Sequence, residues 1–174
     1  MADLSSIVKK DYIEGDEKYY FDTIPMWKFI FLTIVTFGLY HIIWIYKLWK
    51  RLSNNFGYDI SPFWRTAFAI ATCFTLFPLL GKYVKAYCLS SFPGLLFAIL
   101  YLILNFTNKL PDPYSYLVFF ALIIPTVIQL KLNRVNAQNF PNAEVNGWNI
   151  YNTLWTIPFV LFWVLFMFGI IFPE

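Results

Sequence analysis

The chain has 174 residues, of which 59% are hydrophobic, 22% aromatic and only 13% charged, with a formal net charge of +3. Soluble domains carry about 25% charged residues, so this composition excludes an ordinary soluble domain and indicates a multi-pass membrane protein. The net charge is too small to indicate a nucleic-acid partner, and the length leaves no room for a separate soluble domain.

Residues 1–24 are predicted to form an acidic N-terminal tail. Residues 1–25 contain six acids against three lysines, and no apolar signal-peptide core precedes Pro25. We expect this tail to lie on the membrane surface or to be partly disordered. Residues 25–174 are then expected to form a single transmembrane helical domain.

The first membrane span is predicted from Pro25 to about Tyr46. Proline suits the first turn of a helix, and Lys28 is close enough to that end to extend its ammonium outward. We expect the helix to continue into water as KLWKRL, with its three basic residues on one face.

The second apolar segment, Pro62–Leu80, is short for a span. Sixteen uncharged residues separate Arg65 from Lys82, and several threonines lower their hydrophobicity. Because about 17 residues is the lower limit for crossing a bilayer, we predict a short amphipathic or re-entrant helix here, with a fifth span as the alternative.

Three further spans follow. They are predicted in Tyr87–Asn108, in Pro113–Leu130 and in the 29 uncharged residues between Glu144 and Glu174. The predicted fold class is therefore all-α: an integral membrane helical bundle of four transmembrane helices plus one short amphipathic or re-entrant helix.

The distribution of Lys and Arg near the span ends favours four spans over five. Four spans divide these residues 8 to 3 between the two sides, and five spans divide them 6 to 5. Since cytoplasmic loops are enriched in Lys and Arg, the four-span arrangement places both termini outside the cytoplasm. Counting Lys9 and Lys10 as well removes this contrast, because both arrangements then give 8 to 5.

No catalytic constellation is visible in the sequence. The single histidine, His41, has no Ser, Cys, Asp or Glu three or four residues away, whereas catalytic and metal sites need several such groups together. We expect no enzymatic activity, no metal and no cofactor. His41 is predicted either to bond within a helix-packing face or to form an intramembrane polar site.

A polar stripe marks the fourth apolar segment. Gln129, Asn133 and Asn136 follow at spacings that place them on one helix face. Amides at membrane depth usually bond across helices, and the functional alternative is a face that recognises a partner or a lipid headgroup.

A basic and aromatic group flanks the first two apolar segments. Its candidate partner or lipid contacts are Lys47, Trp49, Lys50, Arg51 and Arg65. Such residues anchor a membrane protein against an anionic leaflet, and a defined pocket among them would bind lipid.

The stretch TFGLYHIIWIYKLWKRL (Thr36–Leu52) resembles a family of small bacterial multi-pass membrane proteins known only as a domain of unknown function. The first span of that family carries a Thr-x-Gly-x-Tyr step followed by Trp, Tyr and a basic exit, matched here by Thr36, Gly38, Tyr40, Trp44, Tyr46, Lys47 and Trp49. Looser matches are SPFWRTAF, VIQLKLNRVN and the late Gly147-Trp-Asn149, whereas Phe74-Thr-Leu-Phe-Pro78 departs from the family pattern. The resemblance implies the bacterial cytoplasmic (inner) membrane and supplies no activity.

The leading functional hypothesis is a non-enzymatic accessory or scaffold protein of the bacterial inner membrane. Its partners would be membrane lipids, another integral membrane protein or a second copy of itself. The alternative is a small permease, channel or lipid-handling protein in which His41 and the helices containing Pro125 and Pro158 line a cavity. An enzyme acting on lipid is the third hypothesis.

Overall fold

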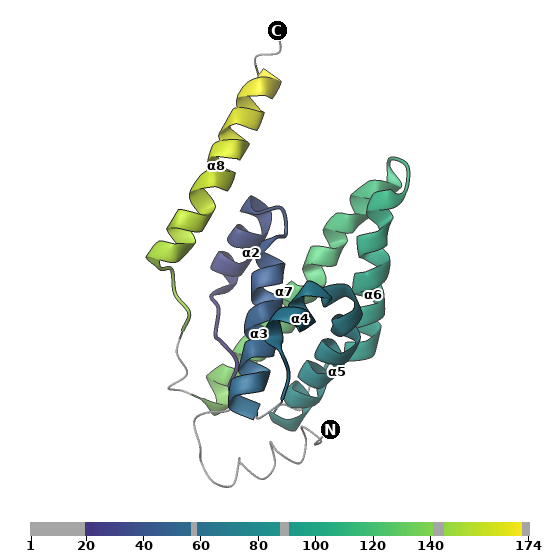
Figure 1. Cartoon of the computed structure of the whole chain (residues 1–174), viewed down its shortest axis with the longest axis vertical. Coiled ribbons are helices and arrows are strands. Elements are labelled where there is room, and N and C mark those ends of the chain that lie inside the picture. Colours follow the sequence, from purple (N-terminus) through teal and green to yellow (C-terminus); the bar gives the residue numbers. More distant parts are fainter. Residues whose placement is uncertain (1–19, 57–58, 88–90, 141–144, 172–174) are drawn as a thin grey trace.

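The computed structural model describes residues 20–56, 59–87, 91–140 and 145–171 (Figure 1). Within these ranges nearly every residue outside the turns is helical, and the β-structure is limited to one isolated bridge between Thr23 and Val145. The predicted all-α class is confirmed for this part of the chain. Residues 1–19 of the predicted tail lie outside the described residues.

The first predicted span is two helices rather than one. Helices α2 (Met26–Val35) and α3 (Tyr40–Phe56) run antiparallel and are joined by a tight turn (Figure 1). In this turn Phe37 and Gly38 have φ values of 51° and 85°, a left-handed conformation that glycine adopts at little cost. The prediction of one continuous helix from Pro25 to Tyr46 is therefore wrong, because the chain reverses at residues 36–39.

The second apolar segment is also interrupted. Helix α4 (Pro62–Ala67) ends at Phe68, and α5 (Ala69–Tyr87) continues in a new direction (Figure 1). The Thr72 hydroxyl donates to the Arg65 carbonyl at 2.6 Å, across this break. Pro62–Leu80 is thus not one straight helix.

Helices α6 and α7 form a long antiparallel arm. Helix α6 (Gly94–Phe106) continues through the 3₁₀ turn η1 (Thr107–Lys109), and the chain returns through η2 (Tyr114–Leu122) into α7 (Ile123–Asn139). At its lower end α6 packs closely on α5, since a Cβ on Gly94 would lie 2.4 Å from the Phe77 carbonyl oxygen. Only glycine permits this approach.

Helix α8 (Ile150–Ile171) packs mainly on α2 (Figure 1). The Trp163 indole stacks on Phe37 with ring centroids 4.7 Å apart and donates to the Val35 carbonyl at 3.2 Å. Most of its other described side chains are apolar and exposed, up to 73% for Tyr151 and 71% for Leu165.

The extended segment Phe21–Ile24 lies in the hydrophobic core and not on the surface. Phe21 and Ile24 are buried, and the Phe21 ring meets the edge of Tyr83 on α5 with centroids 4.8 Å apart. The packed unit therefore begins before Pro25, and the predicted boundary at residue 24 falls inside it.

One helical stretch of the described residues, Tyr114–Asn139, is long and apolar enough by length and composition to cross a membrane. It comprises η2 and α7. Helix α2, the stretch Gly94–Lys109 and the part Ile150–Phe166 of α8 are apolar but shorter. The number of spans accordingly stays a prediction.

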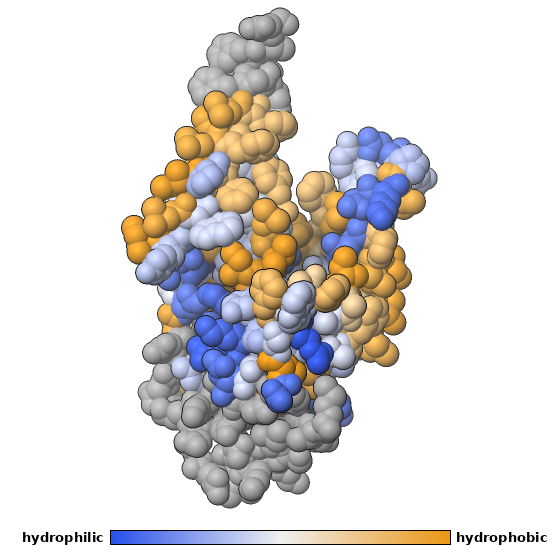
Figure 2. Space-filling model, viewed as in Figure 1, coloured by the Kyte–Doolittle hydropathy of each residue, from blue (hydrophilic) through white to orange (hydrophobic). Residues whose placement is uncertain are grey.

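The C-terminal ends of α3, α5 and α7 lie together at one end of the molecule (Figure 1). They carry a group of charges that we call the basic end: Lys47, Lys50, Arg51, Lys82, Lys85, Lys131 and Arg134. Figure 2 shows hydrophilic residues toward this end and on the loop after α6, with hydrophobic surface between them.

Candidate functional site

The amide stripe of α7 holds the extended N-terminal segment. The Asn133 side chain donates to the Ile24 carbonyl at 2.7 Å and accepts from the Ile24 amide at 3.1 Å. Asn136 donates to the Phe21 carbonyl at 2.5 Å and to the Thr23 hydroxyl at 2.7 Å. These amides therefore bind the backbone of their own chain.

Gln129 links the same segment to α3. Its side-chain oxygen accepts from the Trp44 indole nitrogen at 2.6 Å, and its nitrogen donates to the Asp22 carbonyl at 3.0 Å. Gln129 and Asn136 are each 1% exposed. In the structure the Gln129 amide thus bonds to other elements of the chain, which is the more usual role of amides at membrane depth.

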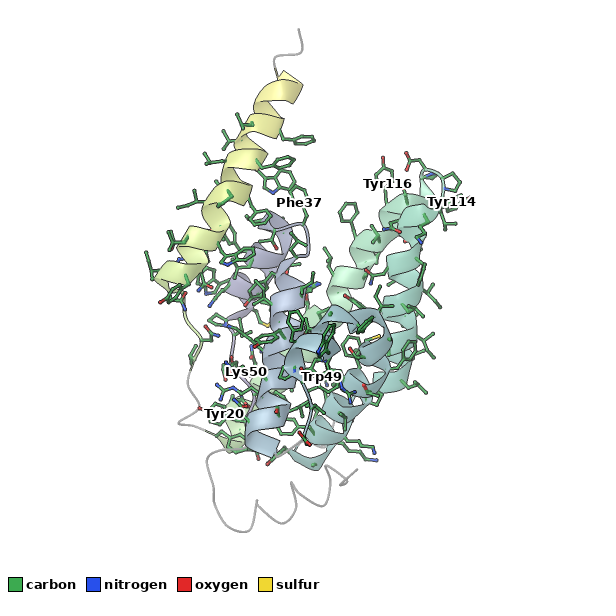
Figure 3. The ribbon with its side chains drawn as sticks, viewed as in Figure 1. Tyr20, Phe37, Trp49, Lys50, Tyr114 and Tyr116 are labelled. Carbon is green, nitrogen blue, oxygen red and sulfur yellow. The ribbon has the colours of Figure 1, made fainter. Side chains whose placement is uncertain are left out.

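Arg51 joins the two ends of the α2–α3 region. Its guanidinium pairs with the Asp22 carboxylate at 2.5 Å and lies over the Tyr20 ring, 5.5 Å from the centroid. Tyr20 and Lys50 appear at the same end of the molecule in Figure 3. The chain thus enters α2 from the basic end and returns to that end along α3.

The remaining basic candidates do not converge on one pocket. Lys50 is exposed, and Lys47 borders a void of about 10 Å³ beside Asp22. The Arg65 guanidinium lies 5.1 Å from the Trp49 ring centroid, and Trp49 is buried. The indole nitrogen of Trp49 has no partner among the described residues.

His41 lies on the wall of a cavity of about 790 Å³. The walls come from the α2–α3 turn, the break between α4 and α5, α6 and η2, and Trp163 of α8 borders one side. In Figure 2 the surface is hollowed between the α2–α8 side and the α6–η2 arm.

The lining of this cavity is almost wholly apolar, with large side chains such as Phe37, Phe68 and Phe119. Its polar members are Thr33, His41, Thr66, Tyr101 and Asn105, and no Lys, Arg, Asp or Glu is among the lining residues. The alternative hypothesis expected the helices containing Pro125 and Pro158 to line a cavity with His41; the stretch Tyr114–Asn139 contributes Phe119 and α8 contributes Trp163, although neither proline is itself a lining residue. A concave, mostly apolar site of this size is typical of a pocket for a small organic molecule.

Several of these polar groups already have partners within the chain. The Thr66 hydroxyl donates to the Pro62 carbonyl at 2.8 Å, and the Asn105 amide donates to the Tyr101 carbonyl at 2.7 Å. His41 Nε2 lies 3.3 Å from the Thr33 hydroxyl oxygen, and the imidazole stacks on Phe29. The described residues contain no group of three or more His, Cys, Asp or Glu side chains placed to hold a metal ion.

The sequence identified His41 and the amide face and raised a cavity beside His41 as one alternative, but it did not define the lining of that cavity. Its walls come from five separated segments, and no local pattern indicates where those segments leave space. The glycine at position 38 is a sequence signal that could have located the turn at the rim of the cavity, because Gly38 has a left-handed conformation there.

A scan against protein-family models matches none, and searches of curated proteins and of solved structures find no similar protein. The resemblance carried by Thr36–Leu52 accordingly stays a prediction.

Proposed function

We propose that this chain is a non-enzymatic, multi-pass membrane protein that binds a lipid in the cavity beside His41. Among the hypotheses raised by the sequence, this is the lipid-handling one. The observation that carries it is a cavity of about 790 Å³ with no charged lining residue.

The exposed apolar surface supports a lipid surrounding. The tip of the α2–α3 hairpin exposes Phe37 by 54% and Leu39 by 47%, and α8 is apolar around most of its circumference. In water such surfaces drive aggregation, whereas in hydrocarbon they cost nothing. We infer that α2–α3 enters the membrane from the basic end and returns without crossing.

The spans are assigned on length. The stretch Tyr114–Asn139 has 26 residues, and α8 has 22 helical residues without a charge. At about 1.5 Å per residue both exceed the hydrocarbon thickness of about 30 Å. Helix α6 with η1 is the returning partner of η2–α7, and α4–α5 is a second re-entrant element. We place the protein in the bacterial inner membrane on the resemblance alone.

The accessory or scaffold hypothesis has less support. It depended on the stripe of Gln129, Asn133 and Asn136 as a partner-binding face, and these side chains bond to residues 21–24 of the same chain. Contacts of the basic end with anionic headgroups remain part of the proposal, at about 1 kcal/mol per exposed basic residue.

The first test is lipid retention by protein purified in mild detergent. We expect native mass spectrometry to find roughly one lipid molecule per chain. Ala71→Trp, which fills the cavity from α5, should abolish retention, and the matched control Ala137→Trp, on the exposed face of α7, should keep it. Equal retention by both variants, or none by the unmodified protein, would contradict the proposal.

A further inference from the structure

We propose that the cavity selects an uncharged lipid with a hydroxyl headgroup, and that this hydroxyl bonds to His41. This inference rests on the proposed function and specifies its ligand. It is carried by the lining of the cavity and by the hydrogen bonding of one imidazole.

The absence of charge in the lining excludes an ionic headgroup from the interior. None of the cavity-lining residues carries a charge that could pair with a phosphate, a carboxylate or an ammonium. Burying an unpaired ion in an apolar site is far more costly than burying a hydrogen-bonded neutral group. A lipid held wholly inside therefore has a neutral polar end.

Among the polar lining residues, His41 has a ring nitrogen that can meet this end. It is 4% exposed, its ring stacks on Phe29, and one ring nitrogen, Nε2, lies 3.3 Å from the Thr33 hydroxyl oxygen. The other nitrogen, Nδ1, has no partner among the described residues. Thr66 and the Asn105 amide nitrogen, by contrast, bond to backbone carbonyls.

The tautomers of His41 indicate which neutral group fits. If Nε2 accepts from Thr33, Nδ1 carries the hydrogen and must donate it; if Nε2 donates to Thr33, Nδ1 must accept. A ligand carbonyl satisfies only the first arrangement. A hydroxyl both donates and accepts, so it pairs with His41 in either state.

The size and shape of the lining accommodate the rest of such a molecule. From His41 the walls continue along Ile42 and Ile45 of α3, along the α4–α5 break and over Phe119 of η2. These surfaces offer hydrocarbon contacts and carry no charge. The hydroxyl is thus fixed at His41 while the chain of the lipid lies along the apolar walls.

The test uses photoactivatable probes on the full-length protein in neutral nanodiscs. Four probes carry the same diazirine-bearing C16 chain and differ in their ends: an alcohol, an alkane, a carboxylic acid and a diacylglycerol. Labelling of cavity residues is mapped by mass spectrometry and normalised to labelling of Leu165 on the exposed face of α8, which corrects for partition into the bilayer.

We expect the alcohol to label the cavity about fivefold to tenfold more than the alkane, the effect of about one hydrogen bond. His41→Phe keeps an aromatic ring against Phe29 but removes both nitrogens, and it should reduce this ratio to about one. His41→Gln should restore part of it. Thr75→Val, which removes an exposed hydroxyl bonded to the Thr72 carbonyl, should leave the ratio unchanged, because neither residue lines the cavity.

The outcomes separate the two proposals. Labelling of the cavity by no probe would overturn the proposed function and this inference together. Equal labelling by alcohol and alkane in the unmodified protein, or stronger labelling by the acid, would overturn the inference alone, whether or not the His41 variants fold. A preference that survives in His41→Phe would also overturn it. Stronger labelling by diacylglycerol than by the simple alcohol would support it and identify a glycerolipid source.

Discussion

Gln129 shows how single side chains join distant parts of this molecule. Its amide contacts Trp44 of α3, the Asp22 carbonyl of the extended segment, and Asn133 one turn along α7. All four groups are polar and lie within or next to the core. Leaving one such group without a partner costs about 1–3 kcal/mol, so the contribution of this amide exceeds that of a single surface hydrogen bond.

Replacing Gln129 with Leu should therefore destabilise the protein markedly. The substitution leaves the Trp44 indole nitrogen and the Asp22 carbonyl without their partner, and we expect the free energy of unfolding to fall by about 2–4 kcal/mol. Denaturant titration in detergent measures this change. The control is Asn139→Leu, since Asn139 donates only to Val135 of its own helix. Equal losses in the two variants would show that the Gln129 contacts are not special.

For individual residues, the sequence predicted which side chains share a face but not what they contact. The spacing of Gln129, Asn133 and Asn136 indicated one face, and this face is what the structure presents to Phe21–Ile24. The partner could not be foreseen, because the acidic residues that precede this segment suggest a solvated tail. Lys28 was expected to extend outward, but its side chain is buried. Its ammonium donates to the carbonyl groups of Asn146 and Gly147, which are 118 and 119 residues away in the sequence.

At the scale of elements, reversals within apolar segments set the architecture. The turn at Thr36–Leu39 divides an apolar stretch that is long enough to span a bilayer, and the break at Phe68 divides the next one. Hydrophobic periodicity does not locate such turns, because residues at the turns, Phe37, Leu39 and Phe68, are themselves apolar. The positions of α6, η2–α7 and α8 followed more closely from composition, since charged or Pro-rich loops bound them.

The attachment of α8 depends on one buried ammonium. Lys28 of α2 donates to the Asn146 carbonyl at 2.9 Å, to the Asn146 side chain at 3.1 Å and to the Gly147 carbonyl at 2.7 Å. These residues lie just before α8, so the three bonds fix the direction in which that helix leaves the body of the protein. Stacking of Trp27 on Trp148 adds to the same junction.

Lys28→Met should loosen α8 without unfolding the remaining helices. The methionine fills a similar volume but cannot donate to the three oxygens. Spin labels at Ile30→Cys and Leu161→Cys, with the native cysteines replaced, report the α2–α8 distance by electron resonance. We expect the distance distribution to broaden in Lys28→Met and to stay narrow in the control Lys109→Met, on the exposed loop after α6. A distribution unchanged by Lys28→Met would rule out this role for the ammonium.

In the molecule as a whole, polar surface lies toward the basic end and on the loop after α6, and apolar surface lies between them (Figure 2). The basic end contains the ends of α3, α5 and α7, whereas the opposite end carries the short polar loop before Tyr114 (Figure 3). The cavity lies away from the basic end, among apolar side chains. Composition alone favours lipid surroundings, which stay a prediction. The position of the cavity could not be derived, since it depends on how five segments pack around His41.

The proposed function requires that α2–α3 enters the membrane and returns, which leaves the cavity within the bilayer. Single cysteines at Tyr20, Lys50 and Asp112, in a chain without native cysteines, test it by labelling with a membrane-impermeant maleimide in right-side-out and inverted vesicles. We expect Tyr20→Cys and Lys50→Cys to be labelled from the same side, because Arg51 lies over Tyr20 and pairs with Asp22. Asp112→Cys should be labelled from the opposite side. Labelling of Tyr20→Cys and Lys50→Cys from opposite sides would show a crossing helix and contradict the account.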